Sequence, residues 1–178
     1  MDTLLKLERV GHPAQSEPAR NLITEYIDWV AGIAIERYGL VFDAAAMIGS
    51  DLSEHSPFRS PAGRLYLIAL GSEYVGVGCL KKLDNSVGEL QRMYVRPDFR
   101  GMGAGRLLLS RLLDDGRVMG LSALRLESLR VLHEAHALYR SAGFVEIGPY
   151  GDHSMANYQK EEETKRFEES VLFMELRF

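Results

Sequence analysis

The sequence predicts an α/β fold built around a mixed sheet. Segments with strand-like alternation and segments with helical spacing follow each other as strand, two helices, three strands, helix, strand, helix and two strands. The composition suits a folded chain, because 46% of the 178 residues are hydrophobic and 26% are charged. A chain of this length buries a sizeable core, and we expect one domain over residues 1–178.

The N-terminal half carries two helical patterns between its strands. Apolar residues recur at helical spacing from Glu17, Pro18 suits a first helical turn, and Gly39 is the expected end. A shorter helix is predicted over Asp43–Leu52, with Asp43 as its N-cap. The strands predicted in this half are Leu4–Val10, Arg64–Leu70 and Tyr74–Leu83, and the last carries two glycines that are typical of a bulge or a close backbone approach, Gly76 and Gly78.

The C-terminal half alternates strands with helices. Helices are predicted over Arg106–Leu113 and Leu132–Ser141, and Ala142-Gly143 is a typical C-terminal end for the second. Gly148–Glu169 is polar and rich in charge, so we expect a loop there, with a turn or two of helix near Glu161–Phe167. The strands predicted in this half are Leu90–Val95, Leu121–Glu127, Phe144–Ile147 and Ser170–Arg177.

Charge, cysteine content and hydropathy argue against several classes of protein. The formal net charge of −4 disfavours a nucleic-acid partner, because proteins that bind nucleic acids usually have a basic face. No apolar run approaches the roughly 20 residues of a membrane-spanning helix, so no membrane partner is expected. The N-terminus alternates in charge, unlike a signal peptide, and the lone Cys79 excludes an intramolecular disulfide. We therefore expect a cytoplasmic protein.

A glycine-rich turn joins the strand at Leu90–Val95 to the helix that follows. Its sequence, Arg100-Gly101-Met102-Gly103-Ala104-Gly105, directs backbone N–H groups and a helix N-terminus at one point. Those first amides have no partner inside the helix, and the helix dipole favours negative charge, so the turn predicts an anion site. The alternative is a plain strand–turn–helix whose glycines serve only close packing.

Two common phosphate loops do not fit this turn. A P-loop requires Lys and then Ser or Thr after its last glycine, whereas Arg106 and Leu107 follow Gly105. The dinucleotide-binding fingerprint requires glycine or alanine at its last position, which is Arg106 or Leu108 in the two registers available. Neither phosphate loop therefore explains the turn.

The pattern Arg-x-x-Gly-x-Gly, formed by Arg100, Gly103 and Gly105, resembles the pyrophosphate loop of the GNAT acyltransferase superfamily. The element order is similar over nearly the whole chain. The resemblance implies a GNAT-like fold with a mixed, mostly antiparallel central sheet, splayed central strands and flanking helices. It also implies acetyl-CoA as co-substrate, with its pyrophosphate on the loop and its pantetheine arm along the exposed strand edge. The residues implied in coenzyme binding are Met93, Tyr94, Val95, Arg100, Gly101, Met102, Gly103, Ala104, Gly105 and Arg106.

Two residues are candidates for proton transfer. Tyr139 and the following Gly143-Phe144 match the family's Tyr-x-x-x-Gly-Phe signature, which implies that Tyr139 donates a proton to the leaving thiolate. A phenol with a reference pKa of about 10 holds its proton at neutral pH. Glu89 opens the strand before the turn, where the resemblance implies that it deprotonates the amine through water, provided that burial raises its pKa. The alternatives are that Tyr139 only packs beside Phe144 and that Glu89 is a solvated charge at a strand end.

One position departs from the family pattern. Leu132 stands seven residues before Tyr139, where family members often carry an Asn that contacts the coenzyme, so this contact is missing or comes from the backbone. His133 and His136 have a spacing that could hold a metal, but no third ligand is evident, so we interpret them as polar helix residues and expect no metal.

The acceptor side is less clearly marked in the sequence. Tyr150 and His153 lie in a loop that could line the acceptor pocket, although a solvated loop is an equal alternative. Arg59 is a further candidate, and the strand end at Glu127-Ser128 offers second-choice polar contacts. Cys79 is interpreted as a small buried hydrophobe, because no His–carboxylate pair accompanies it.

The resemblance implies an N-acetyltransferase that moves an acetyl group from acetyl-CoA to a primary amine by direct attack in a ternary complex. We expect the acceptor to be a small molecule. The alternatives are acetylation of protein or peptide amines and a non-catalytic acyl-CoA-binding sensor. The sequence leaves open whether the chain forms a homodimer.

Overall fold

The computed structural model describes residues 4–151, 153, 155 and 161–178. The strands are β1 (Leu5–Arg9), β2 (Arg64–Leu70), β3 (Glu73–Lys82), β4 (Val87–Val95), β5 (Ala123–Leu129), β6 (Val145–Ile147) and β7 (Val171–Arg177). The helices are α1 (Glu17–Tyr38), α2 (Ala44–Asp51), α3 (Ala104–Val118), α4 (His133–Ser141) and α5 (Glu161–Ser170), with two 3-10 helices, η1 (Pro13–Gln15) and η2 (Pro97–Phe99). This order confirms the predicted α/β fold.

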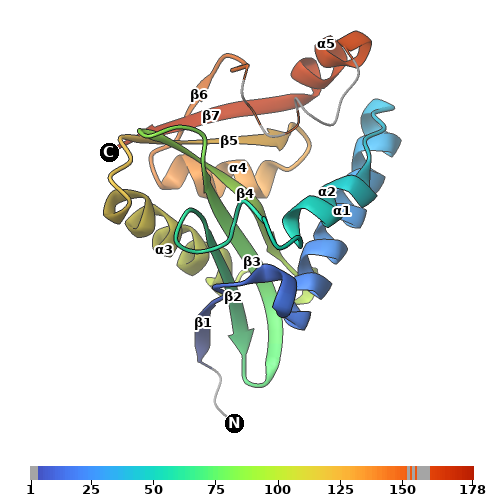
Figure 1. The fold of residues 1–178 in the computed structure, drawn as a ribbon. Helices are drawn as coiled ribbons and strands as arrows, with labels where there is room; N and C mark the ends of the chain where they lie inside the picture. Colours follow the sequence, from blue (N-terminus) through green and yellow to red (C-terminus); the bar gives the residue numbers. More distant parts are fainter. Residues whose placement is uncertain (1–3, 152, 154, 156–160) are drawn as a thin grey trace.

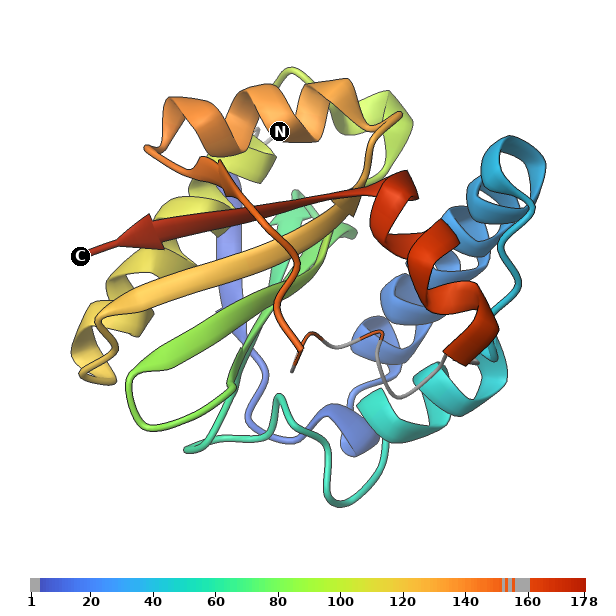
Figure 2. The ribbon, with the colours of Figure 1, turned by 90° about the horizontal axis from the view of Figure 1, so that it is seen from above.

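The strands of the described residues form one seven-stranded sheet in the order β1-β2-β3-β4-β5-β7-β6. Neighbouring strands are antiparallel except β4 and β5, which are parallel. In the described chain, β4 and β5 pair only where Val87–Glu89 meets Ala123–Arg125, and beyond this point they diverge (Figure 2). The mostly antiparallel sheet with splayed central strands is thus confirmed, and the edge of β4 at Met93–Val95 has no pairing with β5.

Helices cover both faces of the sheet (Figure 1). On one face, α1, α2 and α5 pack over a core that includes Ile27, Met47 and Phe167. On the other face, α3 and α4 pack over a second core that includes Leu112 and Tyr139. The sheet separates these two cores, so the gap between β4 and β5 connects one face with the other.

Local sequence accounts for several helix ends. Asp43 caps α2 as predicted, because its carboxylate accepts a hydrogen bond from the Ala46 amide at 2.9 Å. Pro18 lies in the first turn of α1, and α1 ends at Gly39, whose φ of 62° is left-handed. Among the described helices, none combines the length and the apolar composition that crossing a bilayer requires.

The close backbone approach predicted at the two glycines of β3 is confirmed. The pairing of β3 with β4 shifts register between Val77 and Cys79. A Cβ atom at Gly78 would lie 2.8 Å from Met93 Sδ, and one at Gly76 would lie 2.7 Å from the Tyr94 carbonyl oxygen. Glycine at both positions therefore permits the close approach of the two strands.

Some predicted boundaries are wrong by a few residues. α3 is longer than predicted at both ends, because it begins at Ala104, inside the glycine-rich turn, and ends at Val118. β4 begins at Val87 instead of Leu90, so Glu89 lies inside the strand. The length of β4 follows from its pairing with β3 and β5, which local periodicity does not reveal. The helix predicted within the C-terminal loop is present as α5.

Candidate active site

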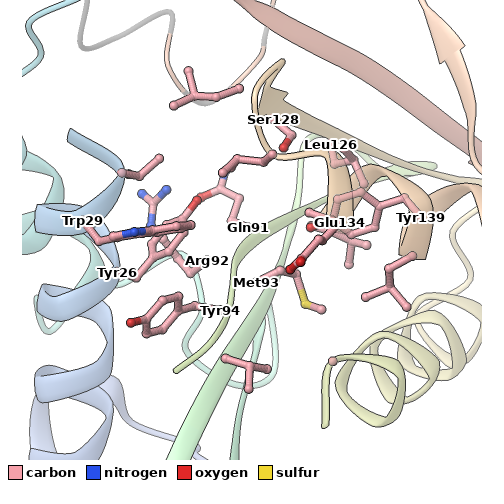
Figure 3. A pocket seen from close by; sticks show the side chains of 18 of the residues that line it. Tyr26, Trp29, Gln91, Arg92, Met93, Tyr94, Leu126, Ser128, Glu134 and Tyr139 are labelled. Atoms are coloured by element: carbon pink, nitrogen blue, oxygen red, sulfur yellow. The ribbon is translucent and has the colours of Figure 1, made fainter. Parts of the chain in front are cut away.

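A cleft of about 790 Å³ occupies the gap between β4 and β5. Figure 3 shows Tyr26 and Trp29 of α1 on one side of it, Tyr139 of α4 on the other, and Met93 of β4 between them. The wall on the α3 and α4 side includes Met93, Val95, Gly101, Gly103, Ala104, Gly105, Arg106, Ala135, Leu138 and Tyr139. The wall on the α1, α2 and α5 side includes Tyr26, Trp29, Val30, Phe42, Met47, Met155, Phe167 and Val171.

The glycine-rich turn forms the start of α3 and faces the cleft. Gly101 and Gly103 have left-handed φ angles of 78° and 89°, and a Cβ atom at either would meet nothing within 4 Å. The first helical hydrogen bond joins the Leu107 amide to the Gly103 carbonyl at 3.0 Å. The three amides from Ala104 to Arg106 therefore have no partner within the helix, and the turn presents open space and free donors to an anion.

Contacts of Arg100 and close helix packing at Gly105 hold the turn against its surroundings. Arg100 donates from Nε to the Val95 carbonyl at 2.9 Å, and its guanidinium lies 5.3 Å from the centre of the Trp29 ring. A Cβ atom at Gly105 would lie 3.3 Å from Leu138 Cδ2, so α3 and α4 approach closely here. Close packing, the alternative interpretation of the glycines, thus applies to Gly105, whereas the other two glycines adopt left-handed backbone beside open space.

The edge of β4 is held from α1. Tyr94 donates its hydroxyl hydrogen to Glu25 Oε1 at 2.8 Å, and Arg96 donates to the same carboxylate from Nε and Nη2. Burial raises the pKa of Tyr94 to about 12, together with the hydrogen bond that Tyr94 donates to Glu25 and the charge of Glu25. These contacts fix α1 against the part of β4, Met93–Val95, that the sequence predicts to hold pantetheine.

Tyr139 lies on the cleft wall and is 6% exposed. Burial raises the pKa of its phenol above the ordinary value, and Tyr26 adds to this. Its ring packs 5.9 Å from that of Phe144, so the predicted packing role is real. Among the described residues its hydroxyl has no hydrogen-bond partner, so a neutral donor is available to a ligand in the cleft.

Glu89 is 0% exposed, which overturns its interpretation as a solvated strand-end charge. Its contacts include hydrogen bonds from Tyr150 Oη at 2.8 Å and Gln91 Nε2 at 2.5 Å, and Lys81 Nζ lies 3.6 Å away. Burial and the charge of Glu127 raise the pKa of Glu89, outweighing Lys81 and the two hydrogen bonds. Glu89 does not line the cleft, whereas Gln91 and Glu127 do.

Glu127 pairs with a histidine from the C-terminal loop. His153 Nδ1 lies 2.9 Å from Glu127 Oε2, and the His153 ring stacks on Phe167 at 5.4 Å. Burial lowers the pKa of His153, but Glu127 and Glu89 raise it by more, so it lies above the ordinary value. His153 and Tyr150 are therefore packed residues, and the solvated-loop alternative is wrong for both.

The carboxylates and Tyr139 lie on opposite faces of the sheet. Leu90, Leu124 and Leu126 belong to the core under α3 and α4, which also contains Tyr139. Successive side chains of a strand alternate between faces, so Glu89 and Glu127 point to the α1, α2 and α5 face. The cleft is the space where groups from the two faces meet.

Sequence reasoning missed an ion pair beside the cleft. Arg92, at the bulge in β4 with a φ of 55°, lines the cleft and donates from Nε and Nη2 to Asp51 of α2 at 2.6 and 3.3 Å. An arginine inside a strand was the only available signal, and its partner lies 41 positions away. Glu134 of α4, also missed, points into the cleft beside Tyr139 (Figure 3).

Several predicted site residues lie elsewhere. Met102 is 55% exposed and does not line the cleft, and Arg59 instead donates from Nη1 to the Glu54 carbonyl at 2.8 Å. Leu132 lines the cleft in place of the family's Asn. His136, interpreted from the sequence as a polar helix residue, lies in α4, where it is buried and 3.1 Å from Ser128 Oγ.

Neither metal nor thiol chemistry is indicated by the described residues. Within them, no three His, Cys, Asp or Glu side chains form a group that could hold a metal ion. Cys79 is fully buried, as predicted, and burial raises the pKa of its thiol well above the ordinary value. The cleft therefore offers free amides, carboxylates and a phenol.

The chain matches known proteins over most of its length. The model of the acetyltransferase (GNAT) family matches residues 34–144. A protein named IAA acetyltransferase from Azospirillum brasilense is 31% identical over 140 residues, which are 78% of this chain and 86% of that protein.

Solved structures show the same fold. A PaiA N-acetyltransferase from Thermoplasma acidophilum, in complex with coenzyme A, has a TM-score of 0.66 at 20% identity and covers 97% of this chain and 99% of its own. A GNAT-family acetyltransferase from Staphylococcus aureus has a TM-score of 0.67 at 19% identity, with the same coverage of 97% and 99%. The family match over residues 34–144 and the 31% identical relative together show that the chain belongs to the GNAT family of acetyltransferases.

Proposed function

We propose that the protein acetylates a primary amine of a small molecule by direct attack on acetyl-CoA in a ternary complex. The observation that carries this proposal is the continuous cleft, which joins the glycine-rich turn on one face of the sheet to the carboxylates on the other. A donor and an acceptor that enter from opposite faces would meet in the gap between β4 and β5.

The donor half fits coenzyme A as a substrate. The free amides of Ala104, Gly105 and Arg106 and the open space at Gly101 and Gly103 suit a pyrophosphate. The unpaired edge of Met93–Val95 suits the amide groups of a pantetheine arm, which can pair with it as a strand would. The thioester then lies between the two faces, where the amine can reach its carbonyl carbon.

Acid and base in this proposal approach from opposite sides of the sheet. The amine nitrogen forms a bond to the carbonyl carbon, the carbon–sulfur bond breaks, and Tyr139 donates its hydroxyl proton to the leaving thiolate. Glu89 accepts the proton of the amine. Because Glu89 is fully buried behind the wall, the proton reaches it through a group or a water at the wall, where Glu127 lies.

Direct attack is supported by the lack of an exposed nucleophile at Cys79. A ping-pong mechanism would need a side chain that carries the acetyl group between substrates. Cys79 is fully buried, its pKa is raised well above the ordinary value, and it does not line the cleft.

Thiol release from acetyl-CoA, measured with a panel of amines, tests this function. Varying both substrates should give intersecting double-reciprocal lines, as expected for a ternary complex. Parallel lines would contradict direct attack. Binding of acetyl-CoA without thiol release on any amine, and acetylation confined to peptide amines, would contradict the proposed small-molecule transfer.

A further inference from the structure

The half of the cleft on the α1, α2 and α5 face has a wall of apolar and aromatic side chains. Separate segments of the chain supply them, namely α1, the residues before α2, α2 itself, the C-terminal loop and α5. These side chains are Tyr26, Trp29, Phe42, Met47, Met155 and Phe167. A ligand with an apolar body would bind such a wall favourably, because binding removes the apolar surface of both from water.

The charges around this half favour a cation over an acid. Glu127 lies on the wall and Glu89 lies behind it. Among the described wall residues, Arg92 is compensated by Asp51 in a buried pair, and Arg100 of the glycine-rich turn lies 5.3 Å from the centre of the Trp29 ring. Behind the wall, Lys81 Nζ lies 3.6 Å from Glu89. His153 Nδ1 lies 2.9 Å from Glu127 Oε2 and compensates this carboxylate while it is protonated. An ammonium group that lies toward Glu127 therefore finds a carboxylate on the wall, whereas a carboxylate beside that ammonium would face the like charges of Glu127 and Glu89.

We propose that the acceptor is a primary amine on an aromatic or similarly bulky apolar body, without a carboxylate beside the amine. This inference rests on the proposed function and narrows its acceptor. The ammonium group lies toward Glu127 and the gap between the strands, and the apolar body lies against α1 and the residues before α2. Free amino acids and polyamines are poorer acceptors, because the first add a negative charge and the second lack the apolar body.

Three amines test the inference at saturating acetyl-CoA. 2-Phenylethylamine has the proposed chemistry, phenylalanine adds a carboxylate beside the same amine, and butane-1,4-diamine replaces the ring with a second charge. We expect kcat/KM to be at least about tenfold higher for 2-phenylethylamine than for either of the others. Equal or faster acetylation of phenylalanine or of the diamine would overturn the inference.

Two wall variants test whether the apolar wall is responsible. Phe42 is half-buried and lines the acceptor half, while Phe99 is half-buried and lines the half next to the glycine-rich turn. Phe42→Asn should lower the ratio of kcat/KM for 2-phenylethylamine to that for the diamine by about tenfold. Phe99→Asn, the matched control, should leave this ratio unchanged. If wild type and Phe42→Asn have the same ratio of kcat/KM for the two amines, with acetyl-CoA affinity retained, this wall does not bind the apolar body of the acceptor.

The outcomes separate this inference from the proposed function. If the diamine or phenylalanine is the best acceptor, the acetyltransferase function stands and the acceptor assignment fails. If acetyl-CoA binds but no amine releases thiol, both fail. Preferred acetylation of 2-phenylethylamine, lost in Phe42→Asn and kept in Phe99→Asn, supports both.

Discussion

Gly103 offers the sharpest test of the proposed pyrophosphate site. Its φ of 89° is left-handed, and a Cβ atom there would meet no other atom within 4 Å. An alanine at this position therefore causes strain through the backbone alone and collides with nothing in the protein. If the turn relaxes to relieve the strain, the free amides at the start of α3 no longer point at a common anion.

Gly103→Ala is expected to change both the stability of the protein and its affinity for acetyl-CoA. A non-glycine residue in left-handed backbone costs about 1–2 kcal/mol, which for a chain of this size lowers Tm by about 2–8 °C. Loss of one charge-assisted hydrogen bond to a phosphate costs about 1.5–3 kcal/mol. We therefore expect the Kd for acetyl-CoA to rise by about 10- to 100-fold in Gly103→Ala.

Gly120 supplies a matched control. It lies just after the other end of α3, has a φ of 74°, and would also place a Cβ atom in open space, but it does not line the cleft. Gly120→Ala should lower Tm by a similar amount and leave coenzyme affinity unchanged. The comparison therefore separates strain in the fold from loss of the anion site.

Titration calorimetry with acetyl-CoA and thermal unfolding of the three proteins provide the measurements. The expected result is a similar Tm loss in both variants and weakened binding in Gly103→Ala alone. Unchanged acetyl-CoA affinity in Gly103→Ala would refute the pyrophosphate site at this turn. Equal loss of affinity in both variants would show that the effect comes from strain in α3.

Three further changes test the groups around the cleft. Tyr139→Phe should lower kcat by about 10²- to 10⁴-fold and leave acetyl-CoA affinity unchanged, if the phenol donates the proton; Tyr66→Phe, which removes a hydroxyl from a buried tyrosine outside the cleft, should leave kcat unchanged. Glu89 must be ionised to accept a proton, so kcat/KM should rise with pH through a pKa above the ordinary 4.5, and this limb should vanish in Glu89→Gln. The raised pKa also means that ionised Glu89 costs stability, so the Tm of Glu89→Gln relative to wild type should increase as pH rises above 4.5. Asp51→Ala leaves Arg92 buried and uncompensated, and urea denaturation should show a loss of about 3–5 kcal/mol in the free energy of unfolding.

Each of these expectations has a contrary outcome. An unchanged kcat in Tyr139→Phe would remove the phenol from the mechanism. If the acid limb persists in Glu89→Gln, the proton acceptor is another group, and Glu127 on the cleft wall is the first to test. If Asp51→Ala is as stable as wild type, another group compensates the charge of Arg92, and the expected penalty for an unpaired buried charge is wrong.

The sequence by itself determined the local geometry of the proposed donor side, because this geometry depends on residues close together in the chain. The left-handed angles of Gly101 and Gly103 and the free amides at the start of α3 follow from the turn sequence alone. The place of Tyr139 near the end of α4, beside Phe144, was likewise readable from one short segment. These local features were predicted correctly although the predicted ends of the helix and strand on either side of the turn were wrong by a few residues.

Only the tertiary structure decided the acceptor side. The sequence left open whether Glu89 is a partly buried base or a solvated charge at a strand end, and the structure shows it buried and hydrogen-bonded to Tyr150, 61 positions away. Arg92 meets Asp51 across 41 positions, and His153 reaches Glu127 from the C-terminal loop. The register of β4, its bulge and the packing of the helices bring these groups together, and burial among distant neighbours shifts the pKa of Glu89. Short sequence patterns contain no information on these distances, so the arrangement of charges at the proposed acceptor side is decided only when the chain folds.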